Sequence, residues 1–191
     1  MDAADTSNQE RSILESLDAL LRSPSVRAAI EPVVERVGRK LAGAPTAVMA
    51  WEPLPLAIYG PSLPTFLQSS WVFILRSQTA TGAERHPNSR QRMMSYRGIG
   101  DIQTGDLAAG DAPTGGPARW HSHPLVSDAT ATLERRWISI PDNVWHQCVV
   151  PEGNWVVVSF HMVPAEQLIE ERPDRAHVGQ TKRKTYLGRP A

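Results

Sequence analysis

The sequence predicts a mainly β protein, a sandwich or barrel of short strands with an N-terminal helical region. Apolar residues recur at helical spacing within residues 1–45, and from Ser70 onward the pattern changes to short apolar or alternating segments separated by turn residues. The 191 residues include 16 prolines, 13 glycines and six tryptophans, which is typical of a turn-rich β protein. Because the expected strands are short and closely spaced, they favour a sandwich or barrel over an α/β sheet.

The composition narrows the class of protein. The 20 basic and 20 acidic side chains balance, so the net charge gives no reason to expect a nucleic-acid partner. Cys148 is the one cysteine, which excludes an internal disulfide and a cysteine-rich zinc module and fits a reducing compartment. No apolar run is long enough for a transmembrane helix, and residues 1–10 lack the features of a secretory signal. We therefore expect a cytoplasmic protein without a membrane partner.

Residues 1–45 are predicted to form two helices. Ser7 and Glu10 have the spacing of a capping box at the start of the first, and Ser23-Pro24 has the form of an N-cap followed by a first-turn proline at the start of the second. Pro32 is expected to kink or restart the second helix, and Gly43 to end it. Each helix carries an apolar stripe, which we expect to cover the outside of the β domain or to form a homodimer contact.

Residues 46–171 are predicted to form the β domain, closed by a short helix over Ala165–Glu171, with a loop over Asp106–Pro117. The basic residues 172–191 are expected to form a loosely ordered tail; alternatively, they bind acidic ligands or pack on a neighbouring subunit. The predicted strands cover Trp71–Leu75, Gln91–Tyr96, Ile99–Gln103, Arg119–His123, Leu133–Ile140, Trp145–Val149 and Trp155–His161, the last ending in an expected edge histidine.

Two segments in the predicted β domain carry residues suited to metal binding. The first reads Glu84-x-His86-x4-Gln91-x6-Gly98, and the second reads Pro141-x-Asn143-x2-His146. On an extended segment Glu84 and His86 point to the same face, because they are two residues apart.

These segments resemble the two motifs of the cupin superfamily, and the resemblance covers roughly residues 70–163. It implies a cupin-type double-stranded β-helix, or jelly-roll, barrel with a metal site and a tendency to form homodimers. Glu84 stands where the family motif has its first histidine, Gln91 stands where it has its glutamate, and no asparagine follows His146 at the family's distance.

Despite these departures from the family motif, the two segments still contain a complete set of metal ligands. Glu84, His86 and His146 provide one carboxylate and two imidazoles, the set found in non-haem Fe(II) sites, and Gln91 is expected as a weak fourth ligand or a hydrogen-bonding neighbour. A divalent first-row transition metal, with Fe(II) favoured, is the expected cofactor. The alternative is that Glu84 pairs with a neighbouring arginine and the site holds no metal.

Five further residues are candidates for the chemistry around such a site. We assign His123 and Tyr96 as candidate catalytic residues, because each side chain can accept or donate a proton. Arg92 and His121 are candidate substrate-binding residues, and Trp145, beside His146, is a candidate pocket wall. The histidine assignments require that His121 and His123, which share one strand face, point into the interior; otherwise they are ordinary surface residues.

The predicted function is that of a metal-dependent cupin enzyme, a non-haem Fe(II) dioxygenase acting on a small acidic or aromatic substrate. One alternative is a metal-dependent lyase or isomerase, since cupin lyases acting on dimethylsulfoniopropionate have a similar outline of N-terminal helices before a barrel. The other is a metal-free cupin that binds a small ligand without catalysis. The expected partners are the small-molecule substrate and a second copy of the chain.

Overall fold

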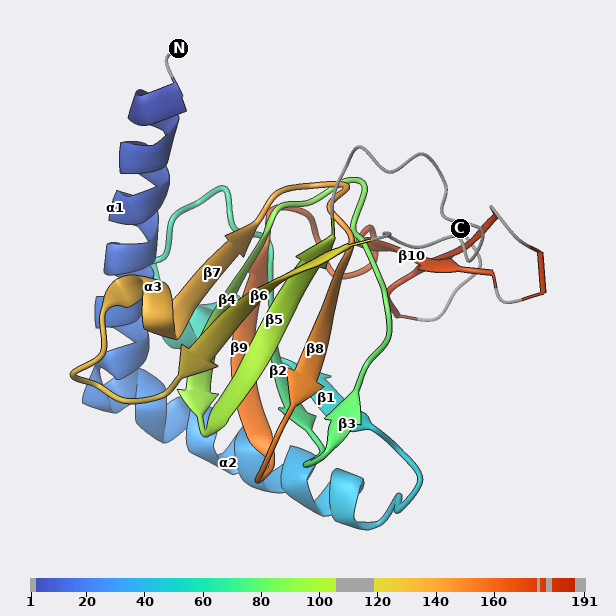
Figure 1. Ribbon diagram of the computed structural model, residues 1–191. Coiled ribbons are helices and arrows are strands. Elements are labelled where there is room, and N and C mark those ends of the chain that lie inside the picture. Colours follow the sequence, from blue (N-terminus) through green and yellow to red (C-terminus); the bar gives the residue numbers. More distant parts are fainter. Residues whose placement is uncertain (1–2, 106–118, 175, 178–179, 188–191) are drawn as a thin grey trace.

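The computed structural model describes residues 3–105, 119–174, 176–177 and 180–187. It shows N-terminal helices followed by two larger antiparallel sheets and a two-stranded hairpin (Figure 1). The helices are α1 (Ala3–Arg22), α2 (Pro24–Ala42), the 3₁₀ segment η1 (Leu56–Ser62) and α3 (Leu133–Arg136). The strands are β1 (Met49–Pro53), β2 (Ser69–Leu75), β3 (Thr79–Ala80), β4 (Gln91–Arg97), β5 (Ile99–Gly105), β6 (Trp120–Val126), β7 (Trp137–Ile140), β8 (His146–Val150), β9 (Trp155–His161), β10 (Ile169–Pro173) and β11 (Thr181–Thr185).

The strand order is that of a jelly roll. One sheet has the order β1-β2-β9-β4-β7 and the other β3-β8-β5-β6. The pairs β2 with β9, β3 with β8, β4 with β7 and β5 with β6 are those of one long hairpin, and successive pairs alternate between the two sheets. Rolling a long hairpin in this way produces the double-sheet jelly roll. The predicted mainly β fold with an N-terminal helical region is therefore confirmed.

Helices α1 and α2 cover one face of the larger sheet. In Figure 1 they run along the left edge and the bottom of the sheets. Their apolar stripes share one buried cluster with the outward side chains of β2, β4 and β9, so the stripes are buried within the chain, as the first of the two expected arrangements requires. Among the described residues, no helix is long and apolar enough to cross a bilayer.

The helix boundaries follow the sequence in part. Ser23 caps α2, because its hydroxyl accepts a hydrogen bond from the Val26 amide, and Gly43 ends the helix as predicted. The capping box is wrong: Ser7 lies inside α1, and the Glu10 carboxylate binds other groups. Helix α2 also continues through Pro32, since its apolar face is buried on the sheet and this packing offsets the lost hydrogen bond.

Three other segments differ from the prediction. The segment predicted as one strand over Leu133–Ile140 forms α3 and β7. Strand β1 was not predicted; it pairs with β2 at the edge of the larger sheet. The helix predicted over Ala165–Glu171 is wrong, because Ile169–Pro173 is strand β10, which pairs with β11 in the basic segment. Glu170 faces Lys184 and Glu171 faces Arg183 across this hairpin, and these two pairs of opposite charges favour the pairing. The loop predicted over Asp106–Pro117 lies outside the described residues.

The space between the two sheets holds a second buried cluster. It is built from the inward side chains of both sheets and from Tyr186, which follows β11. Members such as Trp71, Phe73 and Leu75 alternate along β2 with residues that face the helices. This interior cluster forms the surroundings of the site described next.

Candidate metal centre

Glu84, His86 and His146 meet inside the jelly roll. Glu84 and His146 are joined by two backbone hydrogen bonds, from the Glu84 amide to the His146 carbonyl (2.9 Å) and from the His146 amide to the Glu84 carbonyl (2.8 Å). The exposed fraction of each of the three residues is 8% or less. One carboxylate oxygen and one nitrogen from each ring lie within 4.8 Å of one another. The convergence predicted from the two sequence motifs is therefore present.

Backbone carbonyls fix the orientation of both imidazoles. His86 Nδ1 donates to the Ile169 carbonyl at 2.9 Å, and His146 Nδ1 donates to the Val144 carbonyl at 3.1 Å. A carbonyl oxygen only accepts, so Nδ1 carries a hydrogen in each ring and Nε2 is the nitrogen that faces the centre. Such a bond on the far nitrogen is the usual support of a metal-ligating histidine.

The inward nitrogens have no hydrogen-bond partner. Both His86 Nε2 and His146 Nε2 are buried, and no group in the described part of the chain bonds to either. His146 Nε2 lies 3.6 Å from Glu84 Oε1, which is within ion-pair distance. Leaving buried polar atoms unpaired is costly, and a cation between these atoms would satisfy all three side chains. The donor set therefore fits a divalent transition metal.

Glu84 remains ionised in this buried position. Burial opposes its ionisation, but the His146 ring and the guanidinium of Arg172 outweigh that effect and lower the pKa of Glu84 to about 2. Arg172, on β10, contacts Glu84 Oε2 and leaves Oε1 directed at His146. Burial, followed by the nearby His146, lowers the pKa of His86 to about 4, so its ring is neutral and able to ligate.

Gln91 and His161 lie beside the cluster. Gln91, the first residue of β4, is 4% exposed, and its Oε1 has no hydrogen-bond partner among the described residues. His161 lies opposite Gln91 on β9, its ring meets the His86 ring edge-on with centroids 5.0 Å apart, and its Nδ1 is also unpartnered within the described ranges. The expectation of a satisfied edge histidine at 161 is therefore wrong.

Aromatic and apolar side chains enclose the centre. A cavity of about 10 Å³ is lined by Glu84, Gln91 and Tyr186 together with neighbouring apolar residues of the interior. This volume is close to that of one water-sized sphere. Cys148 also lines it, and burial raises the pKa of its thiol above the ordinary value, so the thiol is protonated.

The structure does not bring Tyr96 or Arg92 to this centre. The Tyr96 hydroxyl donates to Glu31 of α2 at 2.9 Å, and burial followed by Glu31 raises the pKa of Tyr96 to about 12. Arg92 makes two hydrogen bonds to the Glu10 carboxylate of α1, at 2.7 and 2.8 Å. Both side chains connect the sheet to the helices, on the face opposite the interior.

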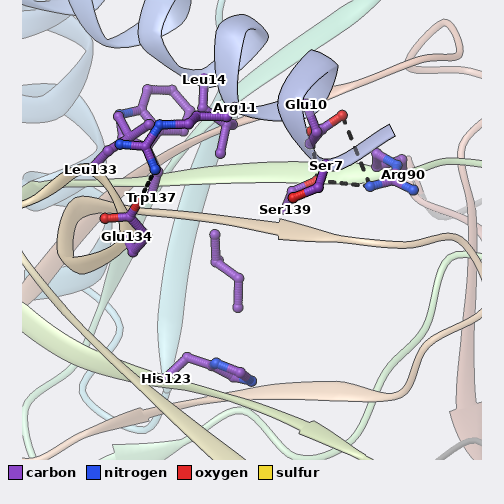
Figure 2. A pocket seen from close by; sticks show the side chains of 11 residues that line it. Ser7, Glu10, Arg11, Leu14, Arg90, His123, Leu133, Glu134, Trp137 and Ser139 are labelled. Atoms are coloured by element: carbon purple, nitrogen blue, oxygen red, sulfur yellow. Dashed lines mark hydrogen bonds and ion pairs between the residues drawn. The ribbon is translucent and has the colours of Figure 1, made fainter. Parts of the chain in front are cut away.

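The other three candidates also lie away from the cluster. His121 is exposed on β6, and Trp145 is half-buried beneath the guanidinium of Arg85, 4.6 Å from the ring centroid. His123 bonds to Thr104 Oγ1 through Nε2 at 2.9 Å and faces a separate cleft of about 730 Å³. Figure 2 shows His123 across this cleft from α1 side chains such as Glu10, whereas the interior cavity has other lining residues.

Sequence reasoning missed Arg172 and Tyr186. Both lie in or beside the hairpin that was expected to be a closing helix and a loose tail. The available indication was the charge pattern, in which Glu170-Glu171 and Arg183-Lys184 suit an antiparallel pair. Nothing in that pattern indicates that Tyr186 enters the interior.

Comparison with known proteins gives weak likenesses. No family model and no curated protein matches the sequence. Among solved structures, pumpkin seed globulin is 14% identical with a TM-score of 0.47 over 66% of this chain and 28% of its own. An oxalate oxidase in complex with glycolate is 16% identical with a TM-score of 0.43 over 62% of this chain and 54% of its own. The oxalate decarboxylase of Lactobacillus farciminis is 9% identical with a TM-score of 0.44 over 61% and 29%.

The fold follows from the chain's own strand order. Strands β2–β5 pair with β6–β9 in two facing sheets, and this pairing defines the roll. The buried cluster consists of His146, the first residue of β8, and of Glu84 and His86 in the segment before β4. The chain is a jelly roll, with two N-terminal helices packed against one of its sheets.

Proposed function

We propose that this protein is a metal-dependent enzyme whose centre is Glu84, His86 and His146, with Fe(II) as the favoured ion and a small acidic or aromatic substrate. The observation that carries the proposal is the pair of buried Nε2 atoms without a partner in the described structure, beside an ionised carboxylate. A non-haem dioxygenase is the reaction class that this donor set supports best.

The side chains have separate tasks in this proposal. Glu84, His86 and His146 would hold the Fe(II) ion, which would supply oxygen activation. The Ile169 and Val144 carbonyls hold the two rings in orientation. Arg172 keeps Glu84 ionised and directed inward. The aromatic interior excludes water, which strengthens the electrostatic interactions within it.

Two other functions are less well supported. A lyase or isomerase needs a proton acceptor at the centre, and the two assigned candidates, His123 and Tyr96, bond to Thr104 and Glu31 instead. His161, beside the cluster, would have to take that role. A metal-free ligand-binding protein is favoured by the Arg172–Glu84 ion pair, which balances the carboxylate charge without a metal. It leaves the two Nε2 atoms unexplained.

Metal analysis and oxygen uptake test the proposal. Protein purified without chelator is expected to contain about one transition-metal ion per chain, and Glu84→Ala and His146→Ala to contain much less. His123→Ala is the matched control, because its imidazole lies in the other cleft. Oxygen uptake with phenolic acids is expected from the iron-loaded protein only. Equal metal content in all four proteins would contradict the proposal.

We also propose that the chain forms a homodimer. The apolar stripes of α1 and α2 are buried against the sheet, so a dimer would use another surface. Sedimentation velocity distinguishes a dimer from a monomer, and a monomer at all concentrations would contradict this part of the proposal.

A further inference from the structure

Tyr186 fills an aromatic slot in the interior of the jelly roll. Its exposed fraction is 6%, and its amide donates to the Leu168 carbonyl at 2.7 Å. The centroid of its ring lies 5.1 Å from that of Trp71, 5.5 Å from Trp51 and 6.2 Å from Phe73. Three aromatic rings therefore surround a single phenol ring at distances typical of favourable aromatic pairs.

This slot adjoins the metal centre. The Tyr186 ring lies 5.9 Å from the His86 ring, centroid to centroid, and lines the same small cavity as Glu84 and Gln91. Small-molecule sites commonly have volumes of about 300 Å³ or more. Since the cavity that remains beside Tyr186 is about 10 Å³, an organic molecule can approach the centre from this side only if the tyrosine ring leaves.

The hairpin that carries Tyr186 is held largely by polar contacts. Arg172 pairs with Glu84, and Arg85 pairs with Glu171 at 2.7 Å. Strand β11 is exposed along residues 181–184 and half-buried at Thr185, so it buries no apolar side chain. A segment of this kind belongs to the parts of a fold that open at low cost in free energy. Tyr186, which follows β11, is the large side chain that this end of the hairpin places in the interior cluster.

We propose that Tyr186 occupies the substrate position of the metal centre, and that this position takes a phenol or a similar monocyclic aromatic ligand. The proposal rests on the metal-dependent function above and makes it more specific. A cavity shaped around an aromatic ring binds a free ring of similar size once its own ring is removed. In the intact chain, the phenol ligand displaces Tyr186, and β11 moves outward with it, while β10, which carries Ile169 and Arg172, stays in place.

Phenol binding to Tyr186→Ala tests the proposal. Tyr59→Ala is the matched control, because Tyr59 is equally buried but packs on Phe160 in the cluster beneath the helices. Calorimetric titration of the metal-free proteins with phenol is expected to show binding to Tyr186→Ala at least about tenfold tighter than to wild type. In the Co²⁺-loaded proteins, phenol is expected to change the visible absorption bands of Tyr186→Ala at a concentration about tenfold lower than it does for Tyr59→Ala, in which Tyr186 must first be displaced.

The outcomes separate this inference from the proposed function. Equal phenol affinity of wild type and Tyr186→Ala overturns the inference, and so does binding that leaves the Co²⁺ bands unchanged. Failure of wild type to bind Co²⁺ contradicts the metal-dependent function. The metal-free titration then still tests whether phenol binds in the position of the Tyr186 ring. If Tyr186→Ala does not fold, hydrogen exchange of wild type decides: phenol is expected to speed exchange at the amides of β11, and unchanged exchange overturns the inference.

Discussion

At the scale of single residues, the buried histidines make the metal-free protein sensitive to acid. The pKa of His86 is about 4 in the folded chain against an ordinary value of 6.5, mainly because of burial. Below pH 6.5 the unfolded chain therefore binds the proton first, and the free energy of unfolding falls until about pH 4. The shift corresponds to about 3 kcal/mol.

Urea unfolding of chelator-treated protein at pH 7 and pH 4.5 measures this loss. His86→Gln, which is neutral at both values, is expected to lose less stability between them than wild type. Burial also lowers the pKa of His161, so the variant keeps part of the dependence. The same loss in both proteins would contradict the assignment to His86.

Arg172 is predicted to be a positioning residue for Glu84. Arg172→Gln is expected to weaken metal binding by about 10-fold to 100-fold, because groups that orient a ligand commonly have effects of this size. Arg183→Gln on the same hairpin is the control, since Arg183 is exposed and lies 3.9 Å from Glu171. Competition with a chromophoric chelator measures both affinities. Unchanged affinity in Arg172→Gln would show that the ion pair does not support the centre.

The sequence predicts the residues of the centre better than their neighbours. Glu84, His86 and His146 are identified by motif spacing, which reflects the local geometry of a strand and a turn. Arg172 reaches Glu84 across 88 positions of sequence, through a hairpin whose pairing depends on tertiary context. Local pattern carries no information on a contact of this kind, so it was missed.

At the scale of elements, a buried ion pair fastens α1 to the sheet. Asp18 accepts hydrogen bonds from Arg136 Nη2 at 2.6 Å and from Trp137 Nε1 at 2.9 Å. Asp18→Ala is expected to lower the free energy of unfolding by about 3 kcal/mol, because it leaves a buried guanidinium unpaired. Glu15→Ala, whose partner Arg11 is exposed, is expected to cost less than about 1 kcal/mol. Chemical denaturation compares the two variants, and equal losses would contradict the predicted fastening of α1.

Two glycines are predicted to respond in opposite ways to alanine. At Gly100 a Cβ would lie 2.1 Å from Trp155 Cε3, so Gly100→Ala is expected to destabilise the protein by about 1–3 kcal/mol. At Gly38, inside α2, the nearest neighbour of an added Cβ would be Ile74 Cδ1 at 3.8 Å, and Gly38→Ala is expected to stabilise the helix by about 0.5–1 kcal/mol. Thermal unfolding gives both signs, and a stable Gly100→Ala would contradict the close approach of Trp155 to β5.

Elements with a strong local pattern follow the sequence, and elements set by long-range pairing do not. The apolar stripes and the Ser23-Pro24 start predict α2 well. The periodicity around Pro32 could not show that packing on the sheet keeps the helix continuous. Ile169–Pro173 has no clear period, and the charged β11 opposite it determines its strand conformation.

At the scale of the whole molecule, the jelly roll brings distant segments to one interior. The pairing of β2–β5 with β6–β9 places the segment before β4 next to the start of β8, although Glu84 and His146 are far apart in sequence. The resemblance of the two motifs predicts that these segments meet. The hairpin of β10 and β11, and the entry of Tyr186 into the interior, were not predicted.

The measurement that tests the account most directly is an anomalous difference map from crystals of the iron-loaded protein. The account predicts a peak within bonding distance of a Glu84 carboxylate oxygen and of Nε2 in both His86 and His146. A map without a peak there, or with iron bound only at exposed side chains, would contradict the proposed centre.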